Sequence, residues 1–161
     1  MLEVFVGCGS NIDAEPNLRW AIIQLEAHFG VCARSNVYQS PAFGFEGPDF
    51  LNLVVGFGVD SDADAVEAIL SELENERGRN QTDRLGSRTL DLDLLLFGKR
   101  VDTARKLPRA DILRYPFVLA PLAEIAPGLK HPVTGVTIRE AWDARAEGIV
   151  TLKRIGALDA G

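Results

Sequence analysis

The chain has 161 residues, 47% of them hydrophobic, which allows one well-formed core and predicts a single domain over residues 1–161. Its net charge of −6 argues against general binding to nucleic acid or to a membrane surface, both of which use basic patches. No stretch approaches the roughly 20 apolar residues of a membrane span. Cys8 and Cys32 match no metal-ligand spacing, so we expect reduced core residues and a cytoplasmic protein.

Hydrophobic periodicity predicts strands and helices in alternation along the first part of the chain. Residues 2–8 are typical of a strand, and residues 16–29 are typical of a helix with one apolar face. A second strand is expected over residues 31–39 and a third over residues 50–59. The segment between them, residues 40–49, is rich in glycine and proline, so the two strands should form a hairpin with a long loop.

The remaining pattern completes a mixed order of elements. A second helix is expected over residues 62–77 and a fourth strand over residues 88–97. The order is then βαββαβ, which predicts an α+β fold: an antiparallel sheet with both helices on one face and the other face open. A C-terminal extension follows, with a short helix near residues 118–125 and a late strand near residues 149–153.

The fourth strand carries two aspartates, Asp91 and Asp93, in an otherwise apolar run, RTLDLDLLLFG from position 88. Residues two apart in a strand share a face, so the aspartates should point one way and these leucines the other: Leu90, Leu92, Leu94 and Leu96. Two adjacent carboxylates repel each other unless a cation lies between them, and Mg²⁺ is commonly held by one or two carboxylates plus phosphates. The pair therefore predicts a metal site; the alternative is a solvated edge strand, which the run LLLF disfavours.

Basic residues gather around this acid pair. Between positions 77 and 114 they outnumber the acidic ones, although the whole chain is acidic. This distribution suits a small polyphosphate better than a polymer, although Lys99 and Arg100 are expected to lie in a solvated loop. The sequence contains no GxxxxGK[ST] motif, so any chemistry with ATP must depend on arginine side chains and a metal.

Longer motifs along the chain resemble those of one known family. They are GSN at 9–11, SPAFG at 40–44, PDFLN at 48–52, GSRTLDLDLLLFG at 86–98 and FVLAPLAEIAP at 117–127. Together they resemble the 6-hydroxymethyl-7,8-dihydropterin pyrophosphokinase family. The resemblance implies a ferredoxin-like fold and a Mg²⁺-dependent transfer of pyrophosphate from ATP to the pterin's hydroxymethyl group, with release of AMP, in folate biosynthesis.

The resemblance also implies roles for individual residues. Asp91 and Asp93 would hold two magnesium ions and, with Arg79 and Arg88, would be the catalytic residues. Residues implied to contact the nucleotide are Glu74, Arg79, Arg84, Arg88, Arg109 and Arg114. Residues implied to bind the pterin are Phe50 and Phe117 as its aromatic walls, Asn52 at its amide edge, and Ser40, Pro41 and Phe43.

Three departures from the family pattern lie on the nucleotide side. Leu85 stands where the family has a tryptophan, Arg109 where it has a histidine, and Tyr115 where it has an arginine. They leave open a pterin-binding paralogue with weak, altered or no transferase activity. An RNA-binding module on the same fold is a second alternative, which the lack of an aromatic-rich strand motif and of a basic surface disfavours. The expected partners are ATP and the pterin, without nucleic acid or membrane, and the next folate-pathway enzyme is the candidate protein partner.

Overall fold

An antiparallel sheet forms the centre of the computed structural model, which describes residues 1–30, 32–42, 47–78, 89–145 and 153–158. Its strands run in the order β5–β1–β4–β3–β6, and the short β2 also pairs with β4. The strands are β1 (Leu2–Ser10), β2 (Ala33–Arg34), β3 (Val37–Ser40), β4 (Phe50–Val59), β5 (Asp91–Phe97) and β6 (Lys153–Gly156). The order β5–β1–β4–β3, with a helix after β1 and another after β4, confirms the predicted ferredoxin-like arrangement.

The hairpin formed by the second and third predicted strands is present, with one difference. The third strand has the predicted bounds, but the second is divided into β2 and β3 at Ser35 and Asn36. The Ser35 hydroxyl accepts the backbone N–H of Val54 at 3.0 Å, where a backbone carbonyl would accept it in regular strand pairing. A side-chain acceptor in place of a carbonyl interrupts the regular pairing and separates the two short strands.

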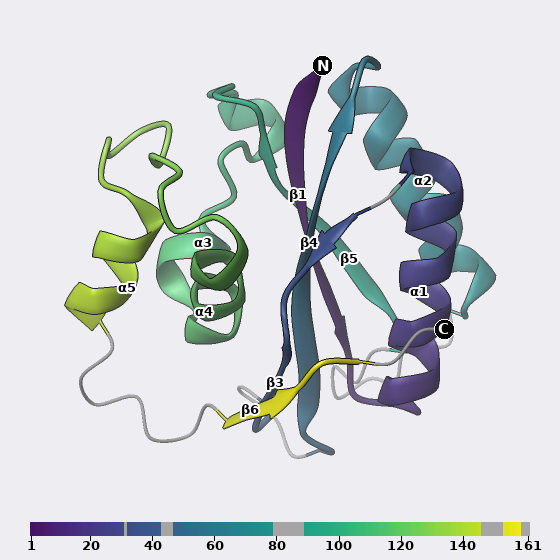
Figure 1. The fold of residues 1–161 in the computed structure, drawn as a ribbon. Helices are drawn as coiled ribbons and strands as arrows, with labels where there is room; N and C mark the ends of the chain where they lie inside the picture. The colour runs from purple at the N-terminus through teal and green to yellow at the C-terminus, as the bar shows by residue number, and fades with distance from the viewer. Residues whose placement is uncertain (31, 43–46, 79–88, 146–152, 159–161) are drawn as a thin grey trace.

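Both predicted helices cover one face of the sheet, on the right in Figure 1. They are α1 (Ala14–Phe29) and α2 (Ala63–Glu76), each within two residues of its predicted bounds. The Asp62 carboxylate accepts the Ala65 N–H at 2.9 Å and so caps the start of α2. Alternate residues of the strands, such as Val6 and Leu53, are fully buried against these helices.

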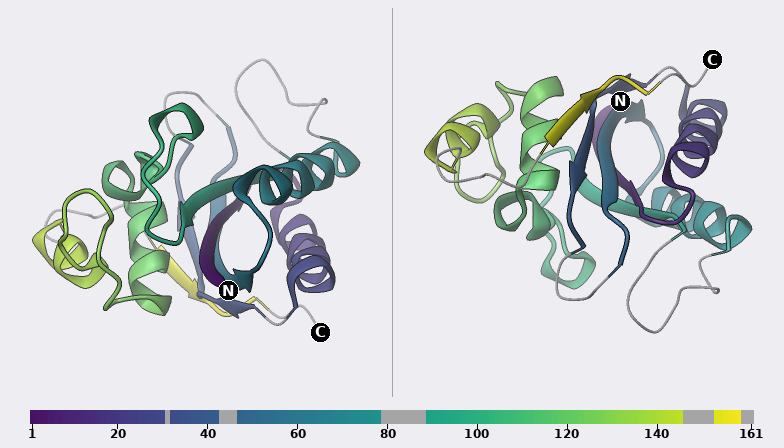
Figure 2. Two further views of the ribbon diagram at one scale, coloured as in Figure 1. Left: turned by 90° about the horizontal axis from the view of Figure 1, so that it is seen from above. Right: turned by 90° about the horizontal axis from the view of Figure 1, so that it is seen from below.

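The opposite face was expected to be open, but C-terminal helices cover part of it. Figure 2 shows the sheet between two helical layers. The second layer contains α3 (Asp111–Arg114), α4 (Pro116–Ile125) and α5 (Ile138–Arg145), and a 3-10 turn, η2 (Thr103–Arg105), precedes it. Helix α4 is apolar enough to form a second core, in which Leu119 and Leu122 lie with Phe5 and Val54 of the sheet. The part of this face next to the aspartates is left open.

A β-bulge in β5 changes which leucines face which core. The pairing with β1 shifts between Phe5 and Val6, so that Leu95 is an extra residue in β5. Leu92 and Leu94 lie in the core with α1 and α2, as do Leu90 and Phe97. Leu96, which was expected on that side, instead lies with Leu95 in the second core. The prediction for Leu96 was wrong because the bulge interrupts the alternation of side chains.

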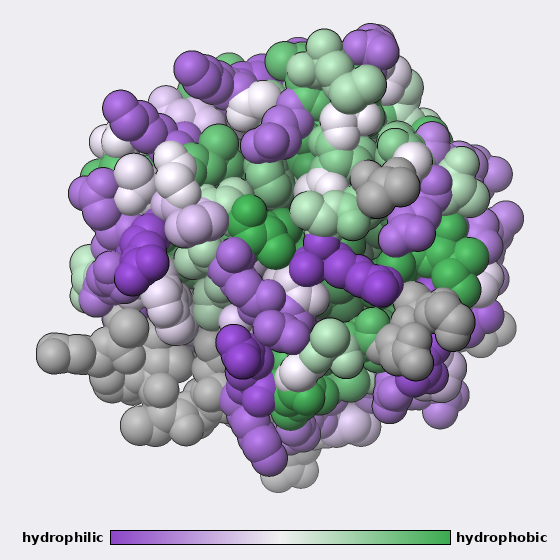
Figure 3. Space-filling view, in the orientation of Figure 1, coloured by the Kyte–Doolittle hydropathy of each residue, from purple (hydrophilic) through white to green (hydrophobic). Residues whose placement is uncertain are grey.

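The C-terminal segment returns to the sheet as β6, which pairs with β3. The late strand was predicted near residues 149–153; β6 begins at Lys153, and residues 149–152 lie outside the described part of the chain. Beyond it, Leu158 is buried in the first core. Figure 3 shows hydrophilic side chains scattered over this face of the molecule between smaller groups of hydrophobic ones. None of the described helices is both long and apolar enough to cross a membrane.

Candidate active site

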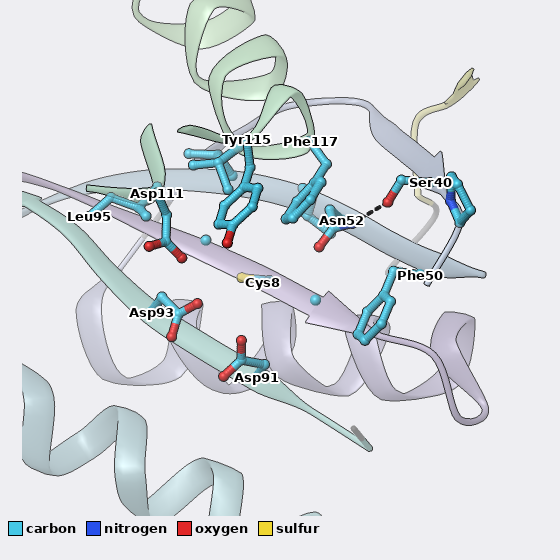
Figure 4. Close-up of a pocket in the computed structure, with 16 residues that line it drawn as sticks. Cys8, Ser40, Phe50, Asn52, Asp91, Asp93, Leu95, Asp111, Tyr115 and Phe117 are labelled. Atoms are coloured by element: carbon cyan, nitrogen blue, oxygen red, sulfur yellow. Dashed lines mark hydrogen bonds between the residues drawn. The ribbon is translucent and has the colours of Figure 1, made fainter. Parts of the chain in front are cut away.

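A pocket of about 380 Å³ opens on the face of the sheet that α4 leaves uncovered. Its floor comes from β1, β4 and β5, and its wall comes from α3, from the start of α4 and from the end of β3. Figure 4 shows three acids, Asp91, Asp93 and Asp111, at one end and Ser40, Phe50 and Asn52 at the other. The pocket thus has an acidic end and an aromatic, amide-bearing end.

Glycines in the central strand keep the floor of this pocket hollow. Gly9 pairs with Asn52 on one side and with Asp91 on the other, so these three residues form a row across β4, β1 and β5. Neighbouring strands are about 4.8 Å apart, which separates the backbones of Asp91 and Asn52 by about 10 Å. A Cβ at Gly9 would lie 2.7 Å from Asn52 Oδ1. The spacing of glycines at positions 7 and 9 indicates a strand with one bare face, and this spacing is the signal in the sequence that marks the pocket floor.

The two aspartates point into the pocket from the start of β5, as their spacing predicted. Burial, followed by the charge of Asp91, raises the pKa of Asp93 to about 8. Arg109 partly offsets the repulsion between these carboxylates. Its Nη2 lies 3.6 Å from Asp93 Oδ1, and its Nε lies 3.3 Å from Asp111 Oδ2. No group of three or more His, Cys, Asp or Glu residues suited to a metal occurs in the described ranges. Among the described residues, a cation here would thus meet the two carboxylates of Asp91 and Asp93, with water or a bound molecule as further ligands.

The residues implied to bind the pterin lie together at the other end of the pocket. Five of the six line it: Ser40, Pro41, Phe50, Asn52 and Phe117. The sixth, Phe43, lies outside the described residues. Asn52 Nδ2 donates to Ser40 Oγ at 3.4 Å, which orients the amide so that Oδ1 lies above Gly9. An aromatic side chain on each side of an oriented amide suits a flat heterocycle with donors and acceptors along its edge.

Two of the charged and aromatic residues that line the pocket were not assigned to either ligand, Asp111 and Tyr115. The Tyr115 ring stacks on Phe117, with ring centroids 5.0 Å apart and planes inclined by 15°. Arg114, which is exposed, places its guanidinium carbon 5.9 Å from the Tyr115 centroid. The aromatic wall is therefore two rings thick. Asp111 was missed because its neighbours in space, Asp93 and Arg109, come together only through the fold.

A second hollow, of about 290 Å³, lies at the outer edge of β5 and shares Asp93 with the pocket. Lys106 and Arg109 line it, as does Glu74, which the resemblance implied to be a nucleotide contact. Only 3% of Glu74 is exposed, and its Oε2 accepts the Leu92 N–H at 2.9 Å. The predicted phosphate-side residues Arg79, Arg84 and Arg88, and also Leu85, lie outside the described residues.

The fold and the pocket define a ferredoxin-like protein with a pocket of small-molecule size on the open face of its sheet. The family model for 7,8-dihydro-6-hydroxymethylpterin-pyrophosphokinase (HPPK) matches residues 5–127. The chain belongs to this family.

Known relatives agree with this assignment. The chain is 39% identical to 2-amino-4-hydroxy-6-hydroxymethyldihydropteridine pyrophosphokinase of Synechocystis over 83% of this chain and 71% of the relative. It is 32% identical to the Bacillus subtilis protein of the same name, over 96% of this chain and 93% of the relative. Plasmodium falciparum HPPK-DHPS matches in fold, with a TM-score of 0.74 at 13% identity, over 95% of this chain and 48% of that one. The chain thus spans about half the length of that solved protein.

Proposed function

We propose that this protein transfers the β,γ-pyrophosphoryl group of ATP to the hydroxymethyl group of 6-hydroxymethyl-7,8-dihydropterin in folate biosynthesis, with release of AMP. The observation that carries the proposal is the row Asp91–Gly9–Asn52, which joins an acid pair to an amide and aromatic end in one pocket of a chain of this family. Within this proposal the domain spans residues 1–161 and acts in the cytoplasm, in keeping with its two free, buried cysteines.

The pterin is proposed to lie over Gly9, between Phe50 and Phe117. Bare glycine backbone allows a flat ring to approach the sheet closely, and the aromatic rings provide its walls. The Asn52 amide offers one donor group and one acceptor to the edge of the ring. When the amide edge of the ring faces Asn52, the hydroxymethyl group at the opposite end points along the row towards Asp91.

Asp91 and Asp93 are proposed to hold magnesium, with two ions expected. The donor set fits: two carboxylates share a face, and their mutual repulsion is a conflict that a cation relieves, as Arg109 now does in part. When bound, magnesium neutralises phosphate charge and brings the reacting oxygen and phosphorus together. Arg109 is then free to turn from Asp93 to a phosphate oxygen, a contact for which its planar guanidinium is suited.

The nucleotide is proposed to occupy the second hollow, because Asp93 borders both spaces and can lie between the two substrates. The hydroxymethyl oxygen forms a bond to the β phosphorus, the bond from that phosphorus to the oxygen bridging to the α phosphate breaks, and AMP leaves with that oxygen. The hydroxyl proton passes to water. Transfers of this kind depend mainly on positioning and charge, so we assign no side chain as general base.

One assay tests the proposal. The protein is incubated with Mg²⁺, ATP and 6-hydroxymethyl-7,8-dihydropterin, and the nucleotide product is identified by chromatography. AMP that forms only when the pterin is present is the expected result. ADP as the product, or pterin binding without any turnover, would contradict the proposal, and the second outcome would indicate a non-catalytic relative.

Substitution of Glu74 tests whether the site depends on the outer edge of β5. Glu74→Leu removes the acceptor for Leu92 N–H and leaves a buried donor unpaired between the two aspartates. Such a loss costs about 1–3 kcal/mol, so kcat/KM should fall by about five- to 150-fold. Glu74→Gln keeps a side-chain acceptor and should retain most of the activity. Steady-state rates of both variants check this, and equal losses in both would argue against a role as acceptor.

A physical association with the next folate-pathway enzyme is part of the proposal. Its support is that solved structures with this fold include proteins named HPPK-DHPS, in which the matching part is joined to another in one chain.

A further inference from the structure

The turn that follows β1 is held against the start of two other strands by buried side chains. Strands β4 and β5 flank β1 and run antiparallel to it, so both begin where β1 ends. The last ladder pairs at this end are Ser10 with Leu51 and Gly9 with Asp91. Residues that precede these pairs on β4 and β5 lie beyond the ladder with β1, so their position depends on other contacts.

Ser10 provides such a contact for β5. Its side chain is fully buried, and its hydroxyl oxygen lies 2.5 Å from the carbonyl oxygen of Thr89. The Ile12 carbonyl, at 3.1 Å, is a weaker alternative acceptor for the same hydroxyl proton. Thr89 comes two residues before Asp91, so the Ser10 hydroxyl fixes the backbone that leads directly into the aspartate pair.

Asn11 provides the corresponding contact for β4. The residue is 4% exposed, and its Nδ2 donates to the carbonyl oxygen of Pro48 at 3.1 Å. Pro48 comes two residues before Phe50, one of the aromatic walls of the pocket. Adjacent side chains, one on the last residue of β1 and one on the first residue of the turn, thus reach the starts of both strands that carry the site.

The turn is itself fixed by contacts with α1 and with the end of α2. Asn17 of α1 donates from Nδ2 to the Ile12 carbonyl at 2.7 Å. Its Oδ1 accepts from Arg77 Nη2 at 2.6 Å and from Nε at 3.0 Å, and the Arg77 guanidinium lies 4.9 Å from the centroid of Trp20. A turn that is tied to both helices can act as a rigid reference for the two strand entrances.

We infer that Ser10 and Asn11 are positioning residues that set the aspartate pair and the pterin wall relative to each other. The inference rests on the proposed function. Ser10 acts on the acid end through Thr89, and Asn11 acts on the aromatic end through Pro48. Loss of either contact should therefore impair one half of the site and leave the other half nearly intact, a pattern that general loss of stability does not produce.

Two equilibrium measurements on the full chain test this inference. Mn²⁺ binding is followed by electron paramagnetic resonance in the presence of a non-hydrolysable ATP analogue, and 6-hydroxymethyl-7,8-dihydropterin binding by calorimetry. Ser10→Ala should weaken Mn²⁺ binding by about tenfold, the value of one buried hydrogen bond, with pterin binding within about twofold of wild type. Asn11→Ala should give the reverse pattern. Ser10→Cys, which keeps the shape with a weaker donor, provides a second variant if Ser10→Ala does not fold.

Thr137→Ala is the control for stability. Thr137 accepts the Glu140 N–H at 3.1 Å and caps α5 on the far side of α4, so its loss should lower the melting temperature and leave both affinities unchanged. The inference is overturned if the Ser10 and Asn11 variants bind both ligands as wild type does, or if either weakens both ligands equally. Failure of the wild-type protein to bind either ligand would instead refute the proposed function.

Discussion

Asp93→Asn is expected to abolish AMP formation and, at the same time, to stabilise the metal-free protein. Asparagine keeps the size of the side chain but removes the charge that we propose holds magnesium. A metal at a reacting phosphate is worth several kcal/mol of transition-state stabilisation, so the rate should fall on the order of a thousandfold or more. Steady-state AMP release measures this loss, and near-normal turnover in the variant would refute the metal assignment.

The gain in stability follows from the environment of the same carboxyl group. Burial and the Asp91 charge raise its folded-state pKa to about 8, above the value of about 3.9 expected in the unfolded chain. Between these values the folded protein binds more protons than the unfolded one, so wild-type stability falls as pH rises from about 4 to about 8. Asparagine does not titrate. The excess melting temperature of Asp93→Asn should therefore grow with pH, as thermal melts in EDTA at pH 5 and pH 8 would reveal.

Asp111→Asn is the matched control. Asp111 also lines the pocket and pairs with Arg109, but it is not among the proposed metal ligands. Its replacement removes an ion pair with Arg109 but does not relieve the repulsion between Asp91 and Asp93. Turnover should therefore remain measurable, and stability should not rise. A stability gain equal to that of Asp93→Asn would indicate that general negative charge, rather than the repulsion at Asp93, limits stability.

Gly9→Ala is expected to weaken pterin binding by about a hundredfold. The added Cβ would lie 2.7 Å from Asn52 Oδ1, closer than such contacts occur, so the amide must move. That movement breaks the hydrogen bond from Asn52 to Ser40 and misplaces the groups proposed to read the pterin edge. Two mispaired hydrogen bonds, at about 1–1.5 kcal/mol each, account for a hundredfold change. Calorimetric titration with the pterin measures it.

Gly7→Ala tests whether the effect is local to Asn52. A Cβ at Gly7 would lie 3.5 Å from Leu95 Cδ2, an ordinary contact with a flexible side chain. Gly7→Ala should therefore weaken the pterin much less than Gly9→Ala does. Similar losses in both variants would show that the floor needs bare backbone throughout and that Asn52 has no special part.

Much of the fold could be predicted because local patterns determine it. The alternation of apolar residues gave β4 its correct bounds, and the 3.6-residue period gave α1 and α2. The division of β2 from β3 and the bulge at Leu95 depend on partners in other strands, Val54 and Phe5, which no local pattern contains. Helices α3 and α5 are short, and their stability comes from packing against α4 rather than from periodicity.

The site could be predicted in part for the same reason. The aspartate pair follows from strand geometry alone, whereas Phe50, Asn52 and Phe117 came from the family resemblance and are joined only by the folded sheet. The pairing of Arg109 with Asp93 was not foreseen, because it requires the chain after β5 to turn back beside the strand. The stack of Tyr115 on Phe117 depends likewise on how α4 begins.

The extra residue at Leu95 also makes the alignment of β5 with β1 unambiguous while the chain folds. A slip of one residue would turn the two carboxylates into the core under α1 and α2 and expose leucines in their place. No uniform shift can compensate, because the segments before and after the bulge follow opposite alternations. A shifted pairing of β5 with β1 is thus strongly disfavoured, because it would bury two carboxylates. The two aspartates therefore help to specify the correct register of this otherwise apolar strand.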